Sequence, residues 1–336
     1  MFRPFRRGVL GALLSLAALL SFCLAPALAS VPHEPRPRPG SLESRLSWGV
    51  QASGVGSAYR KGATGRGVIV AMVDTGIDPA ATALFGHLSP QSIDLVPNRR
   101  HDTGDRRHGA QVATLLAARV DGAGTFGIAY GATLLSIRAD RDGSCLRTCA
   151  FDADVLARAI DYAVAQNAQV IGLPLASGRA IPALEAALTR AVARGVVVVA
   201  AAGNNGGDEP VWPARYAAEP RFAPLMLVAG ASSARGTLAP WSNRAGSTAN
   251  RYVMAPGQHV IVGCGRRTCD LTSGTSYSVA YVAGAVALLL SRTLAPDGVA
   301  AAEALLFHAD ARRHAGSDPV VGRGRLDVAA ALRSLG

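Results

Sequence analysis

The sequence contains almost no lysine and few aromatic residues. Of its 34 basic residues only Lys61 is a lysine, and Phe, Trp and Tyr together make up 5% of the 336 residues. The arginines are scattered in short pairs with few aromatic residues between them, although the formal net charge is +11. A nucleic-acid-binding protein usually concentrates such charge on one element or stripe. We therefore expect no nucleic-acid partner.

Beyond its first thirty residues the sequence also lacks long apolar runs, and it has no regular glycine repeat. The run from Val279 to Leu290 is too short to cross a bilayer and predicts a buried helix. The 37 glycines follow no strict period, which excludes a collagen-like chain. With 49% hydrophobic and 17% charged residues, the chain has enough apolar side chain to bury a core and is not of the disordered class.

The first 29 residues have the pattern of a signal peptide. Three arginines precede an apolar run from Gly8 to about Pro26, and Ala27-Leu28-Ala29 forms a small-x-small cleavage site. The pattern predicts cleavage before Ser30, export to the periplasm or the medium, and no stable membrane insertion afterwards. Two alternatives stay open: a lipoprotein signal at Cys23 and a twin-arginine signal at Arg6-Arg7.

Two regions are expected after the signal. The segment 30–45 is rich in proline and arginine and has almost no apolar spacing, which is typical of a linker or a short pro-segment. Residues 46–336 show no internal repeat and are predicted to form one domain.

Export makes the cysteines informative, because disulfides form in oxidising compartments. Once Cys23 has left with the signal, four cysteines remain, and four cysteines allow three connectivities. Two short-range pairs are the simplest arrangement, since each pair brackets a short loop: Cys145–Cys149 and Cys264–Cys269. A zinc site is the competing interpretation, but spacings of four and five residues are looser than a C-x-x-C motif.

From about residue 46 onward, strand-like and helix-like patterns alternate. Strand-like runs cover 68–73, 132–137, 169–173, 196–202 and 225–231, and helical patterns cover 108–119, 152–166, 181–194, 276–292 and 298–309. Strands that are apolar on both faces and alternate with amphipathic helices imply a mostly parallel sheet covered on both sides. The predicted fold class is α/β, a three-layer domain with a mostly parallel central sheet flanked by helices.

Four polar residues stand where the chemistry of such folds is found, at strand ends and helix starts. Asp74 directly follows the first strand-like run, His108 begins a helix, Asn204 follows the run 196–202, and Ser276 opens the apolar helix near the end of the chain. An acid, a histidine, an amide and a serine are the side chains that acyl transfer requires.

The segments around these residues carry a family resemblance. The stretches VAMVDTGID, HGAQVATLLAA, VVVAAAGNNG and SGTSYSVAYVAG resemble the four blocks of the subtilisin-like serine peptidases, in the order Asp, His, Ser of that family. The resemblance extends from about Trp48 to Asp327. It implies that Asp74 orients the imidazole, that His108 acts as general base and then general acid, and that Ser276 is the nucleophile. It further implies an oxyanion donor at Asn204 and a substrate-lining set consisting of Leu173, Pro174, Leu175, Ala176 and Gly203.

Several positions depart from the usual pattern of that family. After the serine the family usually has Met-Ala, where this chain has Tyr277 and Ser278, and after His-Gly it usually has Thr-His, where this chain has Ala110 and Gln111. The substrate-lining segment, commonly Asn-x-Ser-x-Gly-Gly, reads GLPLAS from Gly172. None of these changes removes a catalytic group, but they leave the P1 preference open.

Other readings of the same residues are weaker. Asp-Thr-Gly after an apolar strand is also an aspartic-peptidase motif, but the second copy at Asp102 has no preceding strand, and those enzymes need two facing loops. The sequence therefore predicts an exported serine endopeptidase acting on protein or peptide substrates without a cofactor. Structural calcium is common in the family, but no ligands can be assigned here. The alternative function is a catalytically silent, subtilase-like binding module.

Overall fold

The computed structural model describes residues 35–77, 82–84, 86–100, 107–146, 149–264, 268–310 and 316–335. These residues belong to one compact unit. The predicted signal peptide and the second Asp-Thr-Gly copy lie outside the described residues.

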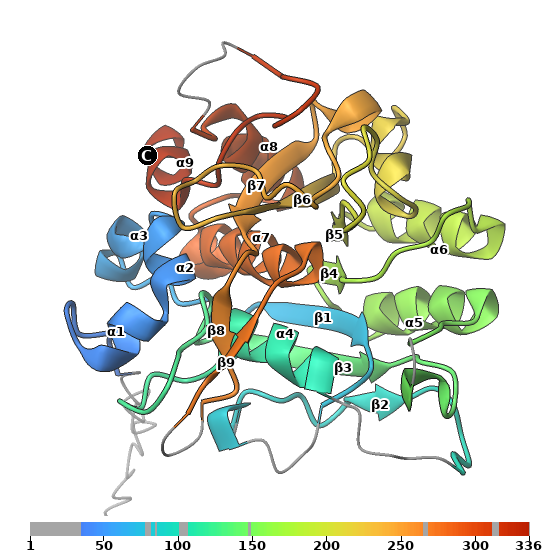
Figure 1. The fold of residues 1–336 in the computed structure, drawn as a ribbon, viewed down its shortest axis with the longest axis horizontal. Coiled ribbons are helices and arrows are strands. Elements are labelled where there is room, and N and C mark those ends of the chain that lie inside the picture. The colour runs from blue at the N-terminus through green and yellow to red at the C-terminus, as the bar shows by residue number, and fades with distance from the viewer. Residues whose placement is uncertain are drawn as a thin grey trace, which may run out of the picture. The chain divides into compact units, whose positions relative to one another are not determined.

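A parallel sheet forms the centre of this unit (Figure 1). In the described ranges it has seven strands in the order β2-β3-β1-β4-β5-β6-β7, and each neighbouring pair is parallel. The strands are β1 (Ile69–Asp74), β2 (Ile93–Asp94), β3 (Thr133–Arg138), β4 (Val170–Leu173), β5 (Val197–Ala201), β6 (Met226–Ser232) and β7 (Tyr252–Pro256). A separate antiparallel hairpin joins β8 (Val260–Val262) to β9 (Asp270–Thr272). This architecture confirms the predicted fold class.

The helices cover both faces of this sheet. The longer ones are α4 (Arg107–Ala117), α5 (Ala153–Ala165), α6 (Pro182–Ala193), α7 (Thr275–Leu290), α8 (Gly298–Phe307) and α9 (Val328–Ser334). Three short helices precede β1, namely α1 (Leu42–Leu46), α2 (Trp48–Ala52) and α3 (Gly56–Arg60). Short 3₁₀ helices lie at Thr82–Leu84, Ser144–Leu146, Ala214–Ala218, Gly246–Thr248 and Ser291–Thr293.

Alternation along the strands creates two hydrophobic cores, because successive side chains of a strand point to opposite faces. Val70 and Met72 of β1 pack with α4, α7 and α8 on one face, whereas Ala71 and Val73 pack with α5 and α6 on the other. The buried members of both clusters are at most 9% exposed. The strands therefore read as continuous apolar runs in the sequence, as expected for a sheet buried on both faces.

Helix α7 lies at the centre of one of these layers. Nearly all of its residues are buried, and it packs against α4, α8 and β4 to β7. It is the apolar run that the sequence predicts to be a buried helix. In the ranges that the structure describes, no helix has the length and apolar character needed to cross a membrane.

The five strands and five helices expected from the sequence are all present, with ends within about two residues of those predicted. The sequence reading did not anticipate β2, β7 or the β8–β9 hairpin. Strand β2 has two exposed residues and no apolar pattern. Strand β7 ends in Pro256 and forms one edge of the sheet, where a proline that cannot donate a hydrogen bond is tolerated.

The segment expected to be a linker ends inside the folded unit. Helix α1 begins at Leu42, and the side chain of Glu43 is 4% exposed. Its carboxylate oxygen Oε1 accepts hydrogen bonds from the backbone N–H groups of Asp121 and Gly122, both at 3.0 Å. The hydroxyl of Ser47 accepts another from the backbone of Phe126 at 2.9 Å. The residues on both sides of position 46 are thus packed on the domain.

Candidate active site

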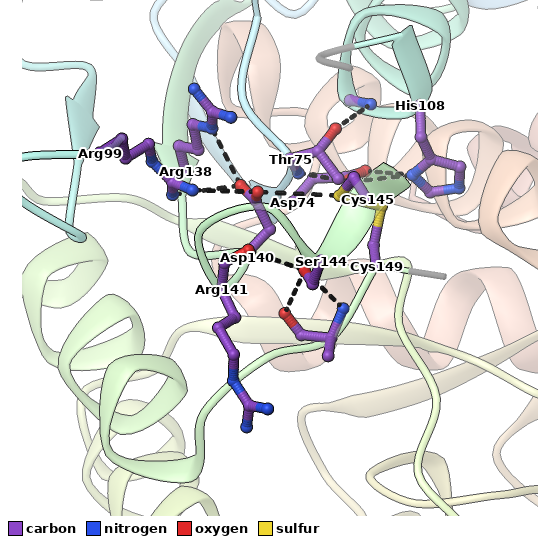
Figure 2. Close-up of a disulfide and its surroundings, with 12 residues drawn as sticks. Asp74, Thr75, Arg99, His108, Arg138, Asp140, Arg141, Ser144, Cys145 and Cys149 are labelled. Carbon is purple, nitrogen blue, oxygen red and sulfur yellow. Dashed lines mark hydrogen bonds and ion pairs between the residues drawn. A yellow bond between two sulfur atoms is a disulfide. The ribbon is translucent and has the colours of Figure 1, made fainter. Parts of the chain in front are cut away.

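Asp74 and His108 are hydrogen-bonded to each other. Asp74 is the last residue of β1 and is almost fully buried, and His108 is in the first turn of α4. The ring nitrogen Nδ1 of His108 lies 2.8 Å from Oδ1 and 2.9 Å from Oδ2 of Asp74 (Figure 2). The backbone N–H of Thr75 also donates to Oδ1, at 2.6 Å. The carboxylate is therefore fixed on one ring nitrogen of His108, which leaves the other ring nitrogen to face elsewhere.

The turn after β1 and the start of α4 are so close that their backbones nearly touch. The backbone N–H of Gly109 donates to the hydroxyl of Thr75 at 3.1 Å. A Cβ atom at Gly109 would lie 2.3 Å from the carbonyl oxygen of Gly76, so a side chain cannot be accommodated there without movement. A glycine after His108 is thus required to bring the imidazole to Asp74.

Ser276 lies in the first turn of α7 and is 9% exposed. In this structure its hydroxyl donates to the carbonyl oxygen of Pro174 at 3.0 Å, which brings it to the end of β4. The next residue, Tyr277, has its ring centroid 5.8 Å from that of His108. The start of α7 therefore lies beside the imidazole of His108.

Asn204 is held by the residue that precedes Ser276. Its side-chain oxygen Oδ1 accepts hydrogen bonds from the backbone N–H and the hydroxyl of Thr275, both at 2.9 Å. The hydroxyl of Thr275 in turn accepts from the backbone N–H of Gly203 at 3.2 Å. Because the oxygen of the Asn204 amide is occupied on this side, its NH₂ group is directed away from Thr275 and keeps its donors for another acceptor.

Of the residues expected to line the substrate, some have side chains buried in the core and one is exposed. The side chains of Leu173 and Leu175 are buried in the core that contains α5 and α6, so they do not face outward. Pro174 offers its carbonyl oxygen to Ser276, and Ala176 is exposed. Gly203 has a φ of 111°, a conformation that favours glycine, and it leads the chain into Asn204. The segment after β4 thus presents mainly backbone atoms, and not the side chains of its leucines, to the surroundings of Ser276.

Both short-range cysteine pairs are close in space. The sulfurs of Cys145 and Cys149 lie 2.19 Å apart, and those of Cys264 and Cys269 lie 2.14 Å apart. Either distance is of the order of a disulfide bond.

A buried ion cluster beside the site was not found by sequence reasoning. The carboxylate of Asp140 accepts from Arg99 at 3.0 and 3.2 Å and from the Nε of Arg138 at 2.9 Å (Figure 2). All three side chains are at most 7% exposed. Arg138 is the register partner of Asp74 in the adjacent strand, so the cluster supports the strand end that carries the acid. The signal in the sequence was a charged residue, Arg138, at the end of an apolar strand.

In the described ranges, no group of three or more His, Cys, Asp or Glu side chains is arranged to hold a metal ion. We therefore assign no calcium ligands.

Comparisons with known proteins agree with this geometry. The profile of the subtilase family matches residues 65–324. Subtilisin BL of Lederbergia lenta is 30% identical over 249 residues, which cover 73% of this chain and 84% of that protein. An alkaline protease of Shouchella clausii is 30% identical over 254 residues, which cover 74% of this chain and 60% of that protein.

Two solved structures have the same fold. A point mutant of the protease domain of PatA superposes with a TM-score of 0.67 at 28% identity and covers 80% of this chain and 94% of its own. The prenylagaramide maturation protease PagA has a TM-score of 0.68 at 24% identity and covers 84% of this chain and 98% of its own. Because the family profile matches most of the chain and the relatives reach 30% identity, the chain belongs to the subtilase family of serine endopeptidases.

Proposed function

We propose that the protein is an exported serine endopeptidase that hydrolyses peptide bonds through an acyl-enzyme, with Asp74, His108 and Ser276 as its catalytic residues. The observation that supports this most directly is the pair of 2.8 and 2.9 Å contacts between Nδ1 of His108 and the carboxylate of Asp74, beside the start of the helix that carries Ser276.

Each of the three catalytic residues has its own role in the proposed reaction. A neutral His108 donates its Nδ1–H to Asp74, which leaves Nε2 as the base for the hydroxyl of Ser276. For this step the hydroxyl of Ser276 must leave the carbonyl oxygen of Pro174 and donate to His108 instead. Ser276 then attacks the peptide carbonyl, His108 takes its proton and passes it to the leaving amine, and water releases the acyl group by the reverse sequence.

Two donors would stabilise the oxyanion of the tetrahedral intermediate. The backbone N–H of Ser276 lies in the first turn of α7, where the partial positive charge of a helix N-terminus favours negative charge. The side-chain NH₂ of Asn204 is the second donor, since its oxygen is already held by Thr275. Donors that are fixed in advance need no reorganisation when the charge develops.

Export is proposed from the sequence of residues 1–29, which have the three regions of a signal peptide. Intact mass and N-terminal sequencing of the secreted protein should give a start at Ser30 or a few residues later. A start beyond Asp74 would be incompatible with the proposed triad.

Covalent labelling tests the catalytic proposal against the alternative of a silent binding module. A fluorophosphonate should label the wild-type protein at one serine, and Ser276→Ala should abolish both labelling and peptidase activity while the melting temperature stays within a few degrees. Wild-type protein that is folded and remains unlabelled supports the silent module. Labelling that persists in the Ser276→Ala variant would overturn the choice of nucleophile.

A further inference from the structure

Two positions at which the chain departs from the usual pattern of its family lie in contact. Tyr277 directly follows Ser276 on α7, and Gln111 lies one turn after His108 on α4. The hydroxyl of Tyr277 donates to Oε1 of Gln111 at 2.8 Å, across 166 residues of sequence. A neighbour of the nucleophile is thus hydrogen-bonded to a neighbour of the base.

A third residue fixes the direction of this hydrogen bond. The hydroxyl of Thr272, on β9, donates to the hydroxyl oxygen of Tyr277 at 2.8 Å. Because the phenol oxygen accepts from Thr272, its own hydrogen is free to point at Gln111. Hydrogen bonds in such a chain polarise one another and strengthen the whole.

The ring of Tyr277 forms one wall beside the imidazole. It is 5% exposed, and its plane is tilted by 49° to the ring of His108 at a centroid distance of 5.8 Å. Burial raises the pKa of the Tyr277 hydroxyl, the negative charge of Asp74 adds to this, and the bond from Thr272 acts in the opposite direction. The phenol therefore stays protonated and remains a donor at neutral pH.

We propose that Tyr277 is a positioning residue of the peptidase site: its hydroxyl holds α4 in register with α7, and its ring restricts the orientation of His108. The inference rests on the proposed function. Asp74 fixes one side of the imidazole, but nothing in that contact sets the distance from His108 to Ser276, which lies on another helix. Proton transfer requires that distance to be close to a hydrogen bond, and a misplacement of about 1 Å can cost as much as a hundredfold in rate.

Removal of the hydroxyl tests the proposal. Tyr277→Phe keeps the ring beside His108 and loses the bonds to Gln111 and Thr272. We expect kcat and the rate constant of fluorophosphonate inactivation to fall by about 3- to 10-fold, the scale of one hydrogen bond, with KM changed less than about twofold. Gln111→Met, which keeps the length of the side chain and removes the acceptor, should have the same effect.

The double variant distinguishes a positioning role from a nonspecific loss of activity. If both substitutions break the same hydrogen bond, Tyr277→Phe/Gln111→Met should be no slower than the slower single variant. Tyr281→Phe is the matched control, because Tyr281 lies one turn further along α7, is buried, and has its hydroxyl beside Gly49 rather than at α4. It should leave kcat unchanged.

Three results would overturn the proposal while leaving the proposed function intact. They are normal kcat and labelling in Tyr277→Phe, single losses that multiply in the double variant, and a loss confined to melting temperature. Failure of the proposed function is distinguishable, because the wild-type protein would then not be labelled at all.

Discussion

The side-chain oxygen of Asn204 accepts two hydrogen bonds from Thr275, the residue before Ser276. This contact joins the loop after β5 to the start of α7 and orients the amide so that its NH₂ is available as a donor. The same contact makes the oxyanion assignment testable.

Asn204→Ala should lower kcat by about 100- to 1,000-fold with little change in KM, because an oxyanion donor acts on charge that exists only in the transition state. This range is the one established for the oxyanion asparagine of subtilisin. Steady-state kinetics on a peptide substrate, with a melting curve for each variant, provides the measurement.

Asn205→Ala is the matched control for Asn204. Asn205 is exposed, and its backbone N–H, not its side chain, is held by Asn243 at 3.0 Å. Its substitution should change the rate only modestly. A large loss of kcat at Asn205 and none at Asn204 would show that the assignment is shifted by one residue.

Glu43→Ala should destabilise the domain by about 1–3 kcal/mol, since two backbone N–H groups at 121 and 122 lose their acceptor. Equilibrium denaturation measures this loss. Glu219→Ala is the control, because Glu219 pairs with Arg221 at the surface, where solvent screens the charges and the pair adds little stability. Equal effects of the two substitutions would contradict the structural role of Glu43.

The same contact predicts where the N-terminal segment can be trimmed. Removal of residues up to Pro39 should leave the melting temperature nearly unchanged, whereas a cut after Arg45 removes Glu43 and should lower it. A mature protein that begins at Leu46 with undiminished stability would be inconsistent with this expectation.

Asp140→Asn should destabilise the domain by about 1–3 kcal/mol, because it removes one of the two carboxylates that pair with the buried guanidinium groups of Arg99 and Arg138, the other being that of Asp94. Chemical denaturation gives the value. Asp161→Asn offers the comparison, since Asp161 and Arg190 are about half exposed and their pair contributes little. Similar losses at both sites would refute the importance of the buried cluster.

Reduction of Cys264–Cys269 should impair activity more than stability. A disulfide that closes so short a loop contributes about 2 kcal/mol or less through chain entropy. Yet the hairpin it closes carries Thr272, which donates to Tyr277 beside the site. Activity and melting temperature of a Cys264→Ser/Cys269→Ser variant test this, and peptide mapping that joined Cys145 to Cys264 would exclude the local pairing.

Much of the fold could be predicted because its signals are local. The runs that form β1, β4 and β5 are apolar on both faces, which only a sheet covered on both sides can bury. Asp74, His108, Asn204 and Ser276 could be selected because each stands at the end of such a strand or the start of a helix. The carboxyl ends of parallel strands lie at the same edge of a sheet, so the sequence predicts that residues at these ends lie close together even when no distance is known.

Only the tertiary structure shows the hydrogen bonds and ion pairs between segments that are distant in sequence. The bond from Tyr277 to Gln111 spans 166 residues, the bond from Asp121 to Glu43 spans 78, and the pair of Arg99 with Asp140 spans 41. A polar residue in the sequence carries no sign of its partner, since hydrogen bonds and ion pairs depend on separations of about 3 Å that only the folded chain sets. For this reason the sequence by itself determined the α/β class and the candidate catalytic residues, whereas the packing of layers decided which side chains hold them in place.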